Sequence, residues 1–277
     1  RRTEAPLPGQ MSDFLKSMAE SSAARAALAP SFTDADFDKP VVPLSLGTFD
    51  VIAEIKQRSP AEGQLGTGHP NTHSKGASHL ISRARAYVEG DAAAISVLTE
   101  PSRFDGDLAH LAEVAAAVPG TPIMRKDFLV EPVQVLEARA AGASGVLLIT
   151  AMLHDDKLRE MIDCAYEHGM FVLLESFDEE DLDRSARFLG DDGQLLIGVN
   201  TRNLRTLEVD SERLHTLAAR LPEAVCVAES GLRVAEDASR VAGLGYSMAL
   251  VGTALMRSDD PTALIASMRE AGAATCS

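Results

Sequence analysis

Ionisable side chains stand where several apolar runs of the sequence end. Lys126 closes the run PIMRK, and Glu175 closes FVLLE. Glu54 and Lys56 lie two residues apart in VIAEIK, so in a β-strand both side chains would point to the same face. A lysine that serves only the fold prefers an exposed face with its ammonium in water. Lysines and glutamates gathered at strand ends are instead suited to general acid–base catalysis.

Further polar residues and glycines follow the later apolar runs. A purely structural explanation exists for each kind: a Glu–Lys pair can be an ion pair of the fold, an asparagine a loop cap and a glycine a turn residue. Burying two lysines, three glutamates and an asparagine at five strand ends is costly, however, which favours a function for the whole group. These further candidates are Asn200, Arg202, Glu229, Ser230, Gly231, Gly252 and Thr253.

The elements that would position these residues repeat one pattern from residue 51 onward. A short, nearly continuous apolar run is followed by a polar turn and an amphipathic, Ala-rich stretch. Such runs are typical of parallel strands covered on both faces. The predicted strands are residues 51–55, 94–98, 122–126, 145–149, 171–175, 195–200, 225–230 and 248–252, and the predicted helices include residues 131–141, 155–168, 178–188 and 234–243.

Eight such units predict an α/β fold, a single (β/α)8 TIM barrel, whose active site would lie at the strand ends and the loops after them. An open doubly wound sheet is the alternative, but it would carry a Gly-rich dinucleotide turn after its first strand, where the sequence has none. We expect residues 49–277 to form the barrel and residues 1–48 an N-terminal extension. Within it, residues 1–10 are a candidate leader, and a helix is expected after Met11.

The composition limits the expected partners. The 277 residues include 26 Lys and Arg against 41 Asp and Glu, which gives a formal net charge of −15. Nucleic acid and anionic membrane surfaces would be repelled at long range, so we expect neither as a partner. Three widely spaced cysteines predict no disulfide framework. We expect a cytoplasmic protein, a monomer or weak dimer, that binds a small anionic substrate in a locally basic cleft.

A Gly/His/Ser-rich stretch at residues 63–79, GQLGTGHPNTHSKGASH, predicts a mobile loop after the first strand. His69, His73 and His79 lie in it without a carboxylate pattern beside them, so we expect no metal site. The loops after strands seven and eight, ESGL and VGTALM, place glycines and a hydroxyl at expected helix starts. Backbone N–H groups there can bind an anion, which makes a phosphorylated substrate the expectation.

Six segments resemble the indole-3-glycerol phosphate synthase family of tryptophan biosynthesis. The resemblance implies a ring closure that needs no cofactor, from 1-(2-carboxyphenylamino)-1-deoxyribulose 5-phosphate to indole-3-glycerol phosphate, carbon dioxide and water. The segments lie between residues 51 and 257, in the family's order, and read VIAEIKQRSP, AAAISVLTEPSRFDGDL, PIMRKDFLVEPVQVLEARAAGA, LLIGVNTRNLRTLEVD, VAESGL and LVGTALMR.

The resemblance also implies roles for the site residues. Lys126 would be the general acid that protonates the substrate carbonyl, and Glu175 the general base or acid–base partner. Lys56 would pair with the substrate carboxylate and is a second candidate for the acid role, with Glu54 orienting it. The remaining residues would be Asn200 and Glu229 for substrate hydroxyls and the lysine network, Phe104 and Phe128 for the anthranilate ring, and Ser59, Arg202, Ser230, Gly231, Gly252 and Thr253 for the phosphate and the rest of the substrate.

Three features depart from the family pattern. The stretch after the first strand reads SPAEG where the family usually has SPSKG, so Glu62 replaces a lysine. That loop is longer than usual, and residues 1–48 match the family's extension poorly. Two alternatives therefore stay open: a paralogue acting on a modified anilino-sugar phosphate in secondary metabolism, and a non-catalytic barrel used as a binding partner. A different phosphate-binding barrel isomerase is a third, although it would not require two lysines in the mouth.

Overall fold

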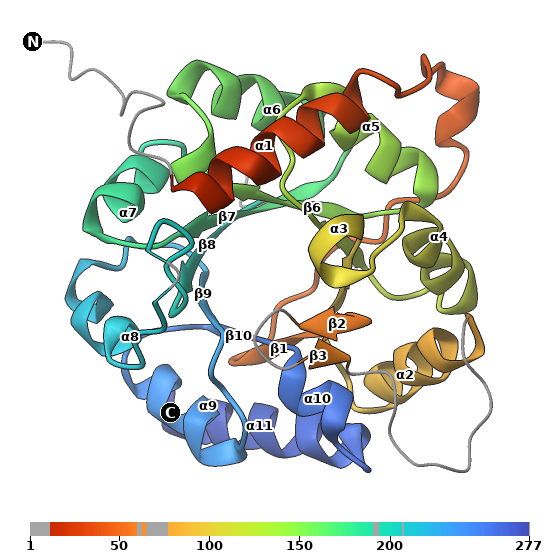
Figure 1. Cartoon of the computed structure of the whole chain (residues 1–277). Coiled ribbons are helices and arrows are strands. Elements are labelled where there is room, and N and C mark those ends of the chain that lie inside the picture. The colour runs from red at the N-terminus through yellow and green to blue at the C-terminus, as the bar shows by residue number, and fades with distance from the viewer. Residues whose placement is uncertain (1–11, 60–62, 65–76, 191–193, 207, 277) are drawn as a thin grey trace, which may run out of the picture.

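Eight parallel strands close into a barrel in the computed structural model of the chain (Figure 1), which confirms the predicted (β/α)8 fold. The structure describes all residues except 1–11, 60–62, 65–76, 191–193, 207 and 277. Neighbouring strands follow chain order around the ring, and β10 pairs with β1 at the closure. The barrel strands are β1 (Asp50–Ile55), β4 (Ala94–Leu98), β5 (Ile123–Lys126), β6 (Gly145–Ile149), β7 (Phe171–Ser176), β8 (Leu195–Asn200), β9 (Cys226–Glu229) and β10 (Met248–Val251).

The predicted strand bounds differ from the observed ones by at most one residue at either end. Strand β9 stops at Glu229 because the next two residues, Ser230 and Gly231, turn into the left-handed region with φ of 69° and 79°. The chain then leaves the sheet toward the outer helices. Such sharp ends place the residues that follow each strand at one mouth of the barrel.

Helices surround the barrel, and most begin with a polar cap or a proline. Asp107, Asp178 and Asp260 each accept a hydrogen bond from a backbone N–H at a helix start. The helices are α1 (Asp13–Ala26), α2 (Ala77–Glu89), α3 (Pro101–Phe104), α4 (Leu108–Ala117), α5 (Pro132–Ala141), α6 (Asp155–Glu167), α7 (Glu179–Ala186), α8 (Arg213–Thr216), α9 (Ala235–Gly243), α10 (Thr253–Arg257) and α11 (Pro261–Thr275), with short 3-10 helices at Asp34–Phe37, Thr150–Met152 and Ala218–Arg220.

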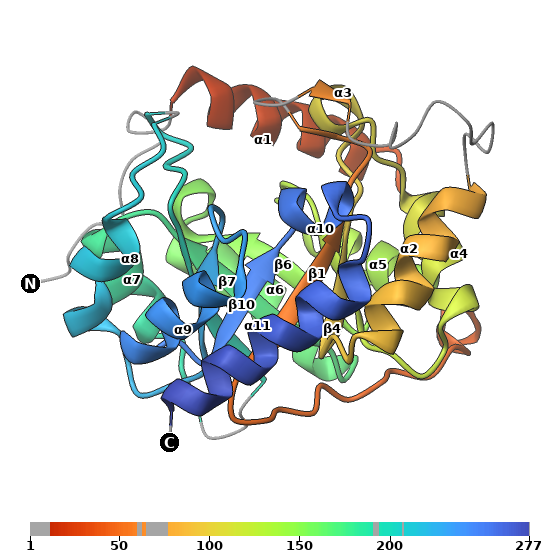
Figure 2. The same cartoon turned by 90° about the horizontal axis from the view of Figure 1, so that it is seen from below.

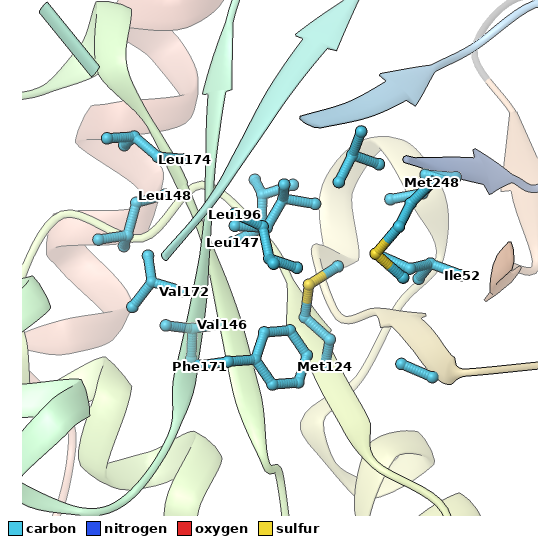
Figure 3. Close-up of a cluster of buried hydrophobic side chains, with 14 of the residues drawn as sticks. Ile52, Met124, Val146, Leu147, Leu148, Phe171, Val172, Leu174, Leu196 and Met248 are labelled. Carbon is cyan, nitrogen blue, oxygen red and sulfur yellow. The ribbon is translucent and has the colours of Figure 1, made fainter. Parts of the chain in front are cut away.

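Apolar side chains fill the barrel at the end where the strands begin. Figure 3 shows Met124, Leu147, Phe171 and Met248 within this cluster. The Phe171 ring lies where a side chain on Gly145 would be, so a glycine is required at the start of β6. This end is therefore closed by packing, which leaves the opposite end for a site.

The N-terminal helix and a small hairpin lie at the open end. Figure 2 shows α1 across the carboxyl ends of the strands, with α3 beside it. Strands β2 (Arg58–Ser59) and β3 (Gly63–Gln64) pair antiparallel just after β1. The prediction of a loop over residues 63–79 is wrong at both edges, because residues 63–64 form β3 and residues 77–79 begin α2. The residues between them lie outside the described part of the chain, as does Glu62.

The described helices include none that is long and apolar enough to cross a membrane. All three cysteines are free in the structure. Cys226 is buried in β9, and burial raises the pKa of its thiol to about 12, so it behaves as a small apolar side chain.

Candidate active site

A cavity of about 890 Å³ opens at the carboxyl ends of the barrel strands. Glu229 lies behind it, with no exposed surface. Ser59 lies on β2, and its side chain is outside the described part of the structure. The other predicted site residues all line the cavity: Glu54, Lys56, Phe104, Lys126, Phe128, Glu175, Asn200, Arg202, Ser230, Gly231, Gly252 and Thr253.

Lys126 lies at the centre of the polar side of this cavity. Its Nζ is 3.2 Å from Glu229 Oε2, 3.5 Å from Glu175 Oε2 and 3.7 Å from Glu54 Oε2. The lysine side chain is 17% exposed and the three carboxyl side chains at most 4%, so the ammonium is the group that faces the cavity. Burial disfavours its charge, but the Glu229, Glu175 and Glu54 carboxyl groups outweigh burial and raise the pKa of Lys126.

Glu54 joins the two lysines of the mouth. Its Oε1 lies 2.7 Å from Lys56 Nζ, as expected for two side chains on one face of a strand. Burial opposes the charge on Glu54, but Lys56 and Lys126 outweigh it and lower the pKa of this carboxyl group. A side chain on Gly252 would overlap Glu54 Oε1 and come within 2.9 Å of Lys56 Nζ. The glycine at this position is thus required by the ion pair.

Glu229 is held beneath Lys126 at the end of β9. Burial and the neighbouring Glu175 carboxyl group raise the pKa of Glu229 well above its ordinary value, which favours the protonated form. Gly198 on β8 makes room for it, because a Cβ there would overlap Glu229 Oε1. Gly198 was not among the predicted site residues. A glycine inside the apolar run LLIGVN was the signal, since strand glycines often mark a close approach.

Aromatic rings line another side of the cavity. The Phe128 ring lies 5.9 Å from the Phe14 ring of α1, edge to face, and 6.3 Å from the Phe104 ring of α3. Leu147 and Ile149 of β6 also line the cavity. The arrangement suits a planar apolar ring. Phe14 was not predicted, because the sequence of the extension does not reveal what its helix covers.

The cavity is basic although the chain is acidic. Arg103, Arg202, Arg233 and Arg257 line it together with the two lysines, whereas its acidic lining residues in the described structure are Glu54, Asp127 and Glu175. Only Arg202 of these arginines was named from the sequence. The other three lie in or after α3, β9 and α10, so the rule that loops after barrel strands carry the site could have identified them.

The loops after β8, β9 and β10 match the predicted roles of their residues only in part. Asn200 Oδ1 accepts a hydrogen bond from the Arg202 N–H at 2.9 Å, which is the loop-cap role given above as an alternative, although Asn200 also lines the cavity. Gly252 caps α10, as predicted. Gly231 does not stand at a helix start, because α9 begins only at Ala235. Its left-handed backbone instead turns the loop toward the cavity.

Among the described residues no group of three or more His, Cys, Asp or Glu side chains is arranged to hold a metal ion. His79 lies in α2, where burial and the nearby Arg83 lower the pKa of its imidazole. His69 and His73 lie outside the described residues.

Known proteins resemble this chain over most of its length. The family model for indole-3-glycerol phosphate synthase matches residues 18–268, including much of the extension that the sequence analysis found poorly matched. A curated indole-3-glycerol phosphate synthase from a Nocardioides species is 43% identical over 251 residues, covering 90% of this chain and 91% of that protein. One from Mycobacterium avium is 44% identical over 223 residues, covering 80% of this chain and 77% of that protein.

Solved structures with low sequence identity share the fold. The 3-hexulose-6-phosphate synthase of Salmonella typhimurium has a TM-score of 0.60 at 13% identity, covering 82% of this chain and all of that chain. The tryptophan synthase alpha subunit of Legionella pneumophila has a TM-score of 0.55 at 14% identity, covering 93% of this chain and 97% of that one. These matches support the barrel alone. The family model and the curated relatives go further: the chain belongs to the indole-3-glycerol phosphate synthase family.

Proposed function

We propose that this chain converts 1-(2-carboxyphenylamino)-1-deoxyribulose 5-phosphate to indole-3-glycerol phosphate, carbon dioxide and water, as its family membership implies. The observation that supports this activity most directly is Lys126, a charged general acid facing a cavity that also holds an aromatic wall and a basic lining. The reaction needs all three: a proton donor, a place for the anthranilate ring, and cations for the carboxylate and phosphate.

Ring closure is the step assigned to Lys126. The ring carbon that carries the carboxyl group attacks the substrate carbonyl carbon, and Lys126 gives a proton to the carbonyl oxygen as its charge develops. The attack removes the aromaticity of the ring, so close placement of the two carbons contributes as much as acid strength. The aromatic wall around Phe128 would provide that placement.

Loss of carbon dioxide and then of water completes the reaction. The bond from the ring to the carboxyl carbon breaks, and its electrons restore the aromatic ring. The new hydroxyl then leaves as water with a proton donated by Lys56, which regains a proton from solvent, while a proton from the neighbouring carbon passes to Glu175, which lies 3.5 Å from Lys126. A lysine and a glutamate this close can exchange the proton and return to their starting states.

Substrate charge would be matched across the cavity. Lys56, which is 14% exposed beside Glu54, would bind the substrate carboxylate until it leaves. The loops at Ser230–Gly231 and Gly252–Thr253 would receive the phosphate, with Arg233 and Arg257 nearby on the lining. Asn200 would contact a substrate hydroxyl, while Glu229 would hold Lys126 from behind through their contact at 3.2 Å.

We further propose that the protein acts as a monomer or weak dimer in the cytoplasm. Side chains of one chain surround the cavity, which supports activity without a partner subunit. Three free cysteines fit a reducing compartment.

Turnover of the carboxyphenylamino substrate, followed by indole fluorescence, tests the proposed activity. The protein contains no tryptophan, so the product signal has little background. We expect product formation in buffer containing a chelator, with one carbon dioxide released per indole. A folded protein that forms no indole from this substrate would refute the proposal.

A further inference from the structure

The N-terminal helix α1 is joined to the end of the strand that carries Lys126. Arg25, in the last turn of α1, donates Nη1 to Asp127 Oδ2 and Nη2 to Asp127 Oδ1, each at 2.8 Å. The Asp127 side chain is fully buried, and that of Arg25 is 27% exposed. Such a two-point contact fixes the mutual orientation of the two groups more closely than a single hydrogen bond.

Asp127 is also held from within the barrel. Its Oδ2 accepts hydrogen bonds from Thr99 Oγ1 at 2.7 Å and from Arg125 Nη2 at 3.3 Å, and Oδ1 accepts one from the Phe128 N–H at 2.8 Å. Asp127 directly follows Lys126 in the chain and precedes Phe128. A carboxylate with these contacts therefore fixes the backbone between the proposed acid and the aromatic wall.

We propose that Arg25 is a positioning residue: by tying α1 to Asp127, it fixes the end of β5 and so the placement of Lys126 and Phe128 against the substrate. Phe14 supports this, because it lies on the same helix and packs edge to face on Phe128. Figures 1 and 2 show α1 at the open end of the barrel, over the side formed by β6 and β7. The helix at the mouth of the cavity would then also position the acid. This inference rests on the reaction proposed above.

Other contacts hold α1 without involving the acid. Ser12 Oγ donates to the Leu204 carbonyl at 2.7 Å, and Gln134 Nε2 donates to Ser22 Oγ at 2.8 Å. Leu15 and Met18 of α1 are buried. Truncating Arg25 should therefore leave the helix attached at its start and middle, and the protein folded, while freeing the end that contacts Asp127.

Steady-state kinetics of Arg25→Ala test the positioning role, with Lys16→Ala as the control because Lys16 is an exposed cation on the same helix. We expect kcat to fall by about 10- to 100-fold in Arg25→Ala, with a smaller change in KM, and no change in Lys16→Ala. Arg25→Lys should recover part of kcat, because it keeps the charge but loses the two-point contact. An unchanged kcat, or a rise in KM alone, would overturn the positioning role.

Amide hydrogen exchange without substrate separates this inference from the proposed activity. Exchange in the last turns of α1 should be faster in Arg25→Ala than in the wild type or Lys16→Ala. If the wild type forms no indole-3-glycerol phosphate, the proposed function fails. Faster exchange in Arg25→Ala would still support the contact that holds α1. Unchanged exchange would show that Arg25 does not hold the helix, and would overturn the inference whatever the kinetics.

Discussion

Two buried charge clusters meet at the end of β5. A carboxyl group in each has a shifted pKa, lowered for Asp127 and raised for Glu229. The central residues of the clusters, Lys126 and Asp127, are adjacent in the chain. The lysine–glutamate cluster consists of Lys126, Lys56, Glu54, Glu175 and Glu229, and the arginine–aspartate cluster consists of Asp127, Arg25, Arg125, Thr99 and Glu137. One faces the cavity, and the other lies beside it between β5, α5 and α1.

The arginine–aspartate cluster joins α1, β5 and α5 through ion pairs. Burial opposes the charge on Asp127, but hydrogen bonds and charges from Arg25 and Arg125 outweigh it and lower the pKa of this carboxyl group. Arg125 is 3% exposed and also binds the Gln134 carbonyl and Glu137. Asp127 therefore keeps its charge at neutral pH, and breaking one of its contacts leaves a charge buried without its partner.

We propose that the lysine–glutamate cluster exchanges protons during the reaction. Burial and Glu175 raise the pKa of Glu229, while Lys126 is shared among three carboxyl groups at 3.2 to 3.7 Å instead of pairing with one. Glu54 in this cluster keeps Lys56 as its own cation and has a lowered pKa, so the contrast with Asp127 lies in Glu229, which has no cation of its own.

The largest effect on stability is expected from Asp127→Ala. The change leaves Arg125 and Arg25 without their shared anion, so the free energy of unfolding should fall by about 3–5 kcal/mol. Asp127→Asn keeps hydrogen-bonding groups and should cost less. Urea unfolding of both variants provides the measurement. A loss below about 1 kcal/mol in Asp127→Ala would mean that this cluster does not hold the fold.

A smaller loss is expected when Gly198 gains a side chain. In Gly198→Ala the new Cβ would displace the Glu229 carboxyl group from beneath Lys126, costing about 1–3 kcal/mol of stability and lowering kcat. Gly120→Ala is the matched control, because a Cβ there meets nothing within 4 Å. Wild-type kcat in Gly198→Ala would show that the position of Glu229 does not matter for turnover.

The raised pKa of Glu229 predicts a pH dependence opposite to that of Asp127. Its protonated form favours the folded state below the unfolded pKa of about 4.3, and this contribution is lost as pH rises through the folded pKa. Asp127, whose folded pKa is lowered, contributes stability above its unfolded pKa of about 3.9 and loses it in acid.

Urea unfolding between pH 5 and pH 8 tests this for Glu229→Gln, which cannot ionise. The wild type should lose stability relative to the variant as pH rises. A constant difference across that range would place the folded pKa of Glu229 near its ordinary value.

The smallest effect is expected from an exposed ion pair outside both clusters. Arg220 lies 2.7 Å from Asp183 and 3.4 Å from Glu179, but its side chain is 44% exposed. Arg220→Ala should change the free energy of unfolding by less than about 1 kcal/mol, because water screens such pairs. A loss as large as that of Asp127→Ala would mean that an exposed ion pair contributes as much to stability as the buried clusters do.

The strands and the lysine and glutamate residues of the cavity could be predicted from the sequence for a physical reason. Continuous apolar runs with polar ends define parallel strands closely, and barrel closure brings their carboxyl ends together. Lys126, Glu54 and Glu175 could therefore be placed in one mouth before the structure was known. Their proximity, within 3.7 Å, follows from topology.

What could not be predicted depends on contacts between distant segments. Arg25 and Phe14 belong to a helix whose sequence does not reveal the surface it covers. Gly198 matters only because Glu229, on the next strand, occupies the space above it. The loop prediction at residues 63–79 failed at its edges because the composition does not reveal the pairing of β2 with β3.

Lys126→Met tests most directly whether the lysine–glutamate cluster serves catalysis while the arginine–aspartate cluster stabilises the fold. Turnover and unfolding are measured on the same preparation. We predict that kcat falls by about 10²- to 10⁴-fold, while the variant still unfolds cooperatively because Glu54 keeps Lys56 as its partner at 2.7 Å. A folded variant that keeps turnover within about tenfold of the wild type would contradict the role of Lys126 as the general acid.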